Sequence, residues 1–229
     1  MWGYLAAIVL PYVVFVGGTI AVHARRNRAA LARWWADTHG CRHLASNQAL
    51  VPHLSGEPFA GGGKAKVREF VSGTTPGGHT FCSFRYSFNV SKSRGSSTSM
   101  RGCVVMVRLP AALPALSLRY EEIGDKIGKF FGGQDIDLES EEFNQMFRVM
   151  SPDEAFASEL LHPLMMRWLM GAKRVLVPFY INGQDLVCVR DGKPDYATLE
   201  RQVVEMCDFV DQIPQGVFEK YAAPSAIGW

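Results

Sequence analysis

Apolar and polar positions alternate with a period of two through one stretch near the middle of the chain. Between residues 82 and 90 every second side chain is apolar: Cys82, Phe84, Tyr86, Phe88 and Val90. This period is typical of a half-buried β-strand. Residues 103–109 are apolar on both faces, as expected of a central strand, and a Ser-, Arg- and Gly-rich segment over 91–99 separates the two. We expect these strands to pair antiparallel.

A second hairpin is predicted around Asn182-Gly183. Both residues tolerate the positive φ angles of a type I′ turn, and apolar-rich segments over 174–181 and 184–190 flank them. Pro178 lies in the first segment and cannot donate a ladder hydrogen bond, which indicates an edge strand.

Helices are predicted between and after the hairpins. The run Ser151-Pro152-Asp153-Glu154 offers an N-cap serine, a proline at the first helical position and a capping-box glutamate. Pro163 should kink or divide this helix. A last helix is expected from about Asp195 to Asp211, because its apolar residues repeat at spacings of three and four. The predicted fold class is therefore α+β, an antiparallel sheet with packed helices.

The N-terminus has a different pattern, which adds one transmembrane helix before this domain. Residues 5–22 carry no charge, and Arg25, Arg26 and Arg28 follow at once. Because the arginines follow the run, we expect a retained signal anchor rather than a cleaved signal peptide. Positive flanks stay cytoplasmic, so the soluble domain should lie on the cytoplasmic side of the plasma membrane. An amphipathic, peripheral helix is the alternative, since the run is short and contains Pro11.

These patterns divide the chain into four parts. They are a transmembrane anchor over residues 1–23, a juxtamembrane basic stalk and linker over 24–65, an α+β soluble domain over 66–213 and a C-terminal tail over 214–229. Helix-forming residues continue the membrane helix into the stalk as far as Trp34 and Trp35. These two tryptophans either contact the membrane interface or pack under the domain.

The formal charge of +2 hides an uneven distribution. Without Arg25, Arg26, Arg28 and Arg33, 20 basic side chains face 22 acidic ones. We expect these four arginines to contact the membrane surface and its anionic lipid headgroups, and we expect no nucleic-acid binding. A topology signal with no further role is the simpler interpretation of the same cluster.

Five carboxylates within residues 135–142 are the candidate metal ligands: Asp135, Asp137, Glu139, Glu141 and Glu142. Oxygen ligands suit a hard divalent cation, and in an extended segment Asp135, Asp137 and Glu139 would share one face. The EF-hand pattern fails because Ser140 occupies the position of its glycine. A solvated acidic loop is the favoured interpretation, and no cofactor is expected.

The five cysteines form no C-x-x-C pair, which is typical of reduced cytosolic thiols. Four lie inside apolar patterns: Cys82, Cys103, Cys188 and Cys207. Buried thiols of this kind are inert, and nothing in the sequence places His79 or His162 beside one. If the domain faced outside, Cys82 and Cys103 on neighbouring strands would be the first disulfide candidates. No catalytic residue is assigned.

Several motifs occur in an order that resembles a known family. They are the turn over 73–78, Phe84-x-Tyr86-x-Phe88, Leu109-Pro110-x-x-Leu113-Pro114-x-Leu116, Leu138-Glu139-Ser140-Glu141-Glu142-Phe143-Asn144-x-x-Phe147-x-Val149, and Ile213-Pro214. With the membrane helix, this order resembles uncharacterised single-pass membrane proteins of actinobacteria over nearly the whole chain. The resemblance implies a membrane-anchored domain of unknown function and transfers no site residue. The Leu-Pro-x-x-Leu-Pro segment should end a strand and enter a loop.

The expected function is that of a non-catalytic adaptor or scaffold at the cytoplasmic face of the plasma membrane, with an unidentified protein partner. The alternative is a membrane-tethered, divalent-metal-dependent enzyme that uses the acidic segment 135–142. Self-association is a third possibility, because Gly17-Gly18 offers a small-residue contact surface in the membrane helix.

Overall fold

The computed structural model describes residues 27–54, 58–59, 65–91, 97–121, 134–171, 178–192 and 194–222. The predicted transmembrane helix over 1–23 lies outside these residues, as do Arg25 and Arg26. Among the helices that are described, none combines the length and the apolar character needed to cross a bilayer.

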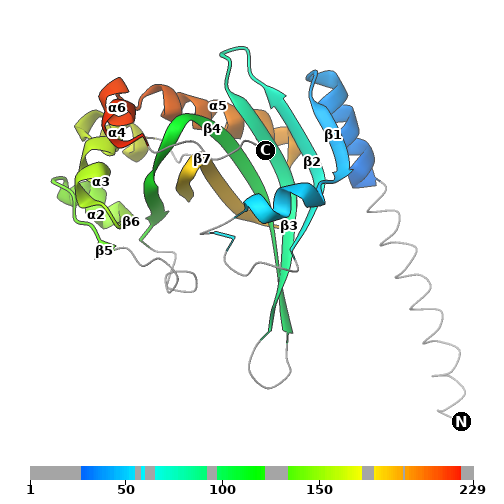
Figure 1. The fold of residues 1–229 in the computed structure, drawn as a ribbon, viewed down its shortest axis with the longest axis horizontal. Helices are drawn as coiled ribbons and strands as arrows, with labels where there is room; N and C mark the ends of the chain where they lie inside the picture. Colours follow the sequence, from blue (N-terminus) through cyan, green and yellow to red (C-terminus); the bar gives the residue numbers. More distant parts are fainter. Residues whose placement is uncertain are drawn as a thin grey trace, which may run out of the picture.

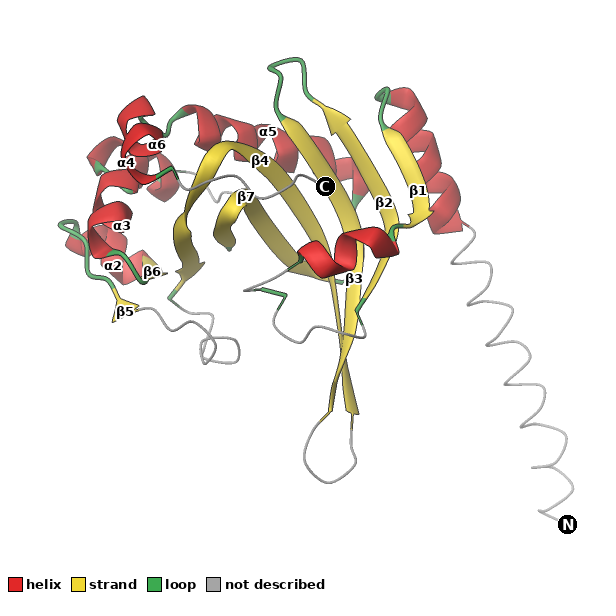
Figure 2. Cartoon of the chain, viewed as in Figure 1, coloured by secondary structure: helices red, strands yellow, loops and turns green. Residues whose placement is uncertain are grey.

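The described strands form one antiparallel sheet (Figures 1 and 2). They are β1 (Arg42–Ser46), β2 (Lys66–Thr74), β3 (Thr80–Ser91), β4 (Ser97–Tyr120), β5 (Gln134–Asp135), β6 (Phe147–Ser151) and β7 (Phe179–Asp191). The strand order is β1-β2-β3-β4-β6-β5, and β7 pairs with the opposite edge of β4. The predicted α+β class with an antiparallel sheet is confirmed.

The long strand β4 holds the two halves of the sheet together. Its first half pairs with β3 as far as Val107, and its last residues pair with β6 from Ser117 onward. Pro110 and Pro114 lie between these two pairings, where the register with β7 also shifts. A missing N–H donor is tolerated there because no partner strand needs it. Our prediction that this segment ends a strand is wrong, since β4 continues to Tyr120.

The predicted hairpin of β3 and β4 is confirmed by their antiparallel pairing, whereas the hairpin around Asn182-Gly183 is wrong. Strand β7 runs without interruption from Phe179 to Asp191. Gly183 has a φ of +61° and lies where the register between β7 and β4 shifts. The positive φ of Gly183 therefore accommodates an irregular pairing within an edge strand, not a hairpin turn.

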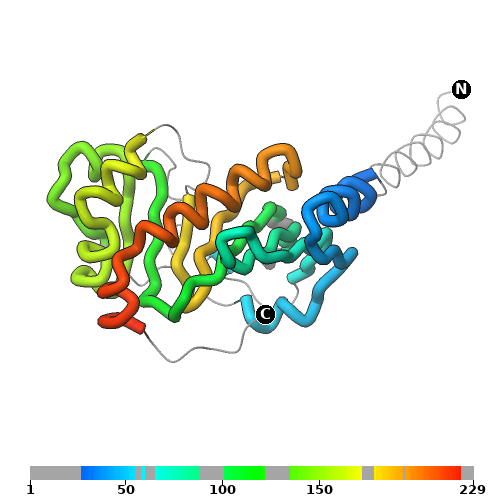
Figure 3. The backbone as a smooth tube through the Cα atoms, turned by 90° about the horizontal axis from the view of Figure 1, so that it is seen from above, coloured from blue at the N-terminus to red at the C-terminus, as the bar shows by residue number. Residues whose placement is uncertain are grey.

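Helices cover both faces of the sheet and one of its ends. They are η1 (Gln48–His53), α2 (Glu141–Met146), α3 (Glu154–Leu160), α4 (Pro163–Met170), α5 (Tyr196–Asp211), α6 (Gln215–Tyr221) and a helix over residues 27–38, here called the stalk helix. Figure 3 shows α5 crossing the sheet on one side. On that face a first core joins α5 and the stalk helix to the sheet, and on the other a second core joins η1 to Phe84.

The helix boundaries follow the predicted signals with one correction. Asp153, not Ser151, caps α3, because its Oδ1 accepts a hydrogen bond of 2.9 Å from the Phe156 N–H. The Ser151 hydroxyl instead donates to the Ala115 carbonyl and ties β6 to β4. Pro163 divides the helical segment as predicted. The apolar residues expected to pack α5 on the sheet are all buried, namely Tyr196, Leu199, Val203, Met206 and Val210.

The sheet and its helices extend beyond residues 66–213, the limits that the sequence pattern predicted for the soluble domain. Strand β1 and η1 fall in the segment 24–65, and α6 falls in 214–229. Each is short, and β1 (RHLAS) lacks an alternating apolar face. Of the two tryptophans, Trp35 is 5% exposed and packs in the first core, whereas Trp34 is 60% exposed.

Gly73 provides a test of the packing between β2 and Cys41, which lies three residues after the end of the stalk helix. A Cβ at position 73 would lie 2.6 Å from Cys41 Sγ. Gly73→Ala should therefore lower the free energy of unfolding by about 1–3 kcal/mol. Removing the sulfur with Cys41→Ala should restore most of that loss in the double variant. Urea unfolding of the four chains measures this coupling.

Gly216→Ala is the matched control, since nothing lies within 4 Å of a Cβ at that helical position. Strictly additive effects of the two changes at 41 and 73 would contradict the proposed contact.

Candidate functional site

A β-bulge in β2 determines which side chains reach each face of the sheet. Arg68 pairs with Arg85 and Val71 pairs with Ser83, so β2 carries one extra residue between these pairs. Within this bulge Glu69 has a φ of +53°, a left-handed conformation that costs a non-glycine residue about 1–2 kcal/mol. The Glu69 side chain faces the stalk helix, whereas Phe70 belongs to the second core. Such strain often marks a functional site.

Glu69 is a buried carboxylate held between two arginines, which we call the Glu69 cluster. Its Oε1 lies 3.2 Å from an Arg85 Nη2 and 3.7 Å from Arg28 Nε, and the Glu69 side chain is 8% exposed. Within the described residues, Glu69 Oε2 and the nearby Tyr196 hydroxyl have no hydrogen-bond partner. Burial, and secondly the charge of Glu69, raise the pKa of Tyr196. The cluster joins the stalk helix to β2 and β3.

The Glu69 cluster contains one of the arginines that the sequence assigns to the membrane surface. Arg28 is partly buried against Glu69, whereas Arg33 is exposed on the stalk helix. Lipid contact by Arg25, Arg26, Arg28 and Arg33 stays a prediction.

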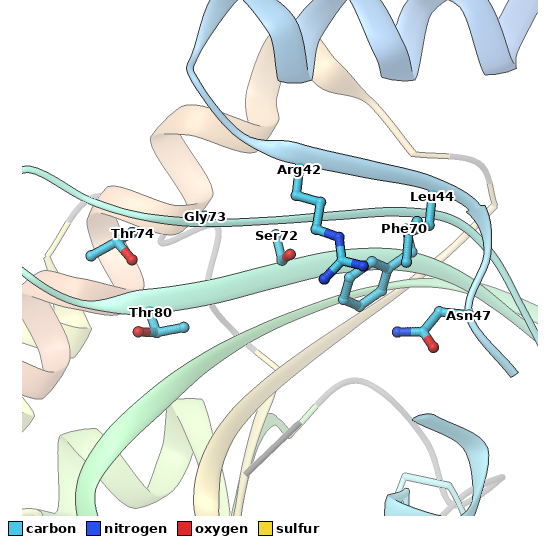
Figure 4. Close-up of a pocket in the computed structure, with 8 residues that line it drawn as sticks. All are labelled: Arg42, Leu44, Asn47, Phe70, Ser72, Gly73, Thr74 and Thr80. Atoms are coloured by element: carbon cyan, nitrogen blue, oxygen red, sulfur yellow. The ribbon is translucent and has the colours of Figure 1, made fainter. Parts of the chain in front are cut away.

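A pocket of about 370 Å³, here called the sheet pocket, opens on the face to which Phe70 contributes (Figure 4). Three neighbouring strands and the residue after β1 line this pocket. The lining residues are Arg42 and Leu44 of β1, then Asn47, then Phe70, Ser72, Gly73 and Thr74, which all belong to β2, and finally Thr80 of β3. Figure 4 shows Arg42 reaching across β2 toward Phe70, with hydroxyl side chains to one side and Asn47 to the other. The sequence analysis assigned none of these residues to a binding site.

The floor of the sheet pocket is apolar and fixed, and its rim is polar. Phe70 stacks on Phe84, with ring centroids 6.3 Å apart and planes 26° from parallel. Because Phe84 is fully buried in the second core, Phe70 has little freedom to move. Arg42 is exposed, and the lining residues that the structure describes include no carboxylate. The pocket therefore offers hydrogen-bonding groups above a rigid apolar surface.

A smaller cavity of about 180 Å³ lies under the first turns of α5. It is lined by Ser83 and Cys103 of the sheet, by Arg190 near the end of β7, and by Thr198 and Gln202 among others. Burial raises the pKa of Cys103 to about 12. A thiol with this pKa is not a nucleophile at neutral pH.

The other thiols of the apolar patterns are equally unsuited to nucleophilic chemistry. Burial raises the pKa of Cys188 and of Cys207 to about 11, and that of Cys82 well above its ordinary value. His79 Nε2 lies 2.9 Å from Asp211 Oδ1, and His162 caps α4. The inert interpretation of these cysteines is supported.

Cys82 and Cys103 do not form the disulfide considered for an outward-facing domain. Cys82 belongs to the second core, whereas Cys103 lines the cavity on the α5 side of the sheet. The two thiols therefore point to opposite faces, and all five cysteines are free.

In the acidic segment, Asp135, Asp137 and Glu139 are exposed while Ile136 and Leu138 between them are buried, an alternation that fits an extended segment. Asp135 Oδ2 lies 2.9 Å from Arg148 Nε. Among the residues that the structure describes, no group of three His, Cys, Asp or Glu side chains is placed to hold a metal ion. Metal binding by the segment stays a prediction without geometric support.

The neighbouring motif residues have structural roles. Ser140 caps α2 by accepting a hydrogen bond from the Phe143 N–H. The Asn144 side chain both donates to the Leu138 carbonyl and accepts from the Leu138 N–H. These bonds fix the turn between the acidic segment and α2.

The chain has an α+β fold in which one long central strand, β4, joins both halves of an antiparallel sheet. Comparison with protein-family models found no match, and comparison with curated protein sequences also found none. Among solved structures, the crystal structure of the mycobacterial trehalose monomycolate transport factor A is similar, with a TM-score of 0.59. At 12% sequence identity, the match covers 87% of this chain and 99% of that one. The two proteins share a fold across nearly their whole lengths.

Proposed function

We propose that this protein is a non-catalytic accessory factor of glycolipid transport, acting as an adaptor or scaffold at the cytoplasmic face of the plasma membrane. The observation that carries the proposal is the shared fold with a transport factor over 87% of this chain and 99% of the other. Because 12% identity is low, the similarity supports the type of role and not a particular lipid.

The attachment of the stalk helix to the sheet supports an anchored role. Arg28 contacts Glu69, and Trp35 lies 6.4 Å from the Phe81 ring and 6.2 Å from the Tyr196 ring, measured between centroids. The helix that follows the predicted anchor is thus packed against the domain rather than joined to it by a loose linker. Such packing would hold the sheet pocket at a defined position relative to the membrane.

The alternative function, a metal-dependent enzyme, gains less support. Asp135, its first candidate ligand, is paired with Arg148. Calorimetric titration of the full chain with Mg²⁺, Mn²⁺ or Ca²⁺ tests it directly. Binding that is abolished by Asp135→Asn with Asp137→Asn would revive the enzyme hypothesis.

The test of the proposed function is deletion of the gene in its source organism, followed by measurement of envelope glycolipids in surface extracts and in isolated plasma membranes. We expect a glycolipid to accumulate in the plasma membrane while its total synthesis stays unchanged. The full chain should restore the distribution. A chain beginning at Ala24, which keeps the stalk helix but lacks the anchor, should not.

An unchanged distribution in the deletion strain would refute the transport role. Recovery by the chain that begins at Ala24 would refute the need for an anchor. Self-association through Gly17-Gly18 stays a separate prediction, and cross-linking of the parent against Gly17→Leu measures it.

A further inference from the structure

We propose that the sheet pocket binds a hexose-type sugar, either free or as the headgroup of a glycolipid. The sugar chemistry is argued from the pocket itself, and only the choice of a glycolipid as its source rests on the proposed function.

The rim of the sheet pocket holds five polar side chains that have no partner among the described residues. They are Arg42, Asn47, Ser72, Thr74 and Thr80. Within the described part of the chain, no hydrogen bond or ion pair engages any of these side chains. Polar side chains that gather around a concavity and bind nothing in the protein are available to a ligand.

The chemistry of this set matches a polyol. Ser72, Thr74 and Thr80 each carry a hydroxyl that both donates and accepts, and the Asn47 amide also does both. A sugar hydroxyl needs partners of both kinds. The guanidinium of Arg42 adds a planar pair of donors, which fits two adjacent oxygens on one ring.

The apolar floor matches the other side of a sugar ring. The C–H groups of a pyranose form a flat, weakly polar surface, which can lie against the half-buried Leu44 and the small accessible part of Phe70, a side chain that is 4% exposed. Stacking on Phe84 holds Phe70 in place, so no ordering cost arises there on binding. A volume of about 370 Å³ lies near the lower end of the range for small-molecule sites, as expected for one or two sugar rings.

An anion is a poorer match for the same pocket. Among the described residues of the lining, Arg42 is the one that carries a charge. The strands that form the wall use their backbone amides in the sheet, where Arg42 pairs with Ser72 and Thr74 pairs with Thr80. Phosphate sites usually combine several cations or free backbone amides, so phosphate would gain little here.

The experiment uses the full chain in a nonionic polyoxyethylene detergent, which has no sugar headgroup. Trehalose is titrated in one arm and inorganic phosphate in another, with binding followed by ligand-observed NMR. A third arm measures cosedimentation with vesicles that contain or lack a diacylglycerol with a disaccharide headgroup. We expect saturable trehalose binding that phosphate does not displace.

Two variants locate the site. Thr80→Val keeps the shape of the side chain and should weaken binding about threefold, and Arg42→Ala should weaken it about tenfold or more. Arg167→Ala, an exposed arginine on α4, is the matched control and should bind like the parent.

The vesicle arm identifies the source of the sugar. If the chain binds disaccharide-lipid vesicles more tightly than it binds free trehalose, and Arg42→Ala abolishes vesicle binding, the source is the lipid headgroup. Trehalose binding without cosedimentation would identify the free sugar.

Phosphate binding without trehalose binding would overturn the sugar assignment, and trehalose binding that survives both variants would overturn the pocket. The failures of the two proposals are separable. If gene deletion leaves the glycolipid distribution unchanged while trehalose binds through Arg42, the transport role fails and the site stands. If deletion alters the distribution but the parent chain binds no trehalose, the site fails and the transport role stands.

Discussion

Glu69→Ala is expected to lower the free energy of unfolding by about 3 kcal/mol or more, because it removes a buried carboxylate that contacts two partly buried guanidinium groups. Arg85 and Arg28 are only 18% and 21% exposed, so water cannot fully replace the lost partner. Chemical denaturation of the full chain measures the loss. Glu139→Ala, an exposed carboxylate of the acidic segment, is the control and should change stability by less than about 0.5 kcal/mol.

Glu69→Gly separates the charge from the backbone strain at the same position. Glycine adopts a φ of +53° without strain, so the glycine variant should be about 1 kcal/mol more stable than the alanine variant. Equal stability of the two would show that the bulge is not strained. A loss below about 1 kcal/mol in Glu69→Ala would show that the arginines do not depend on the carboxylate.

The protein is also expected to lose stability steeply in alkaline solution. In the folded state burial raises the pKa of Cys103 from 9.0 to about 12, and the pKa values of Cys188 and Cys207 from 9.0 to about 11. The unfolded chain therefore releases these protons first. The contribution of these thiols to the free energy of unfolding is fully present below pH 9. Above pH 9 it declines by about 1.4 kcal/mol per pH unit for each thiol. The Tm should fall by roughly 10 °C between pH 8 and pH 10.

Two core variants test the origin of this alkaline loss. Cys188→Ala removes one of the buried thiols with a raised pKa, so the Tm of this variant should fall less steeply with pH than that of the parent. Val187→Ala empties a neighbouring buried position without touching a thiol, and it should keep the parent's slope from a lower starting Tm. Identical slopes in all three chains would rule out the thiols as the cause.

Sequence patterns predicted the elements whose signals are local and long. The alternation over 82–90 and the apolar repeat in 195–211 each recur often enough to define one face of a strand or helix. The hairpin predicted at Asn182-Gly183 is wrong because a positive φ at Gly183 is compatible with both a turn and a register shift. Pairing with β4, some seventy residues earlier in the chain, decides between the two, and no local pattern records it.

The sheet pocket and the Glu69 cluster could not be predicted for a related reason. Ser72, Thr74 and Thr80 are ordinary polar positions of two strands, and they become neighbours of Arg42 only when β1 joins the sheet. One signal for the bulge was present, since Val67, Phe70 and Val71 break the period of two that a regular strand would keep. The acidic segment, in contrast, was conspicuous in sequence and is now tied to Arg148 at Asp135.

The position of β4 affects how the chain can fold during synthesis. Its residues 102–118 pair with β7, which begins only at Phe179, so one edge of the central strand stays open until that segment has been made. Contacts so distant in sequence form slowly, and an open strand edge is a template for aggregation. A nascent chain that stops before Phe179 should therefore be a target for chaperones and proteases, even though β1 to β3 are already complete.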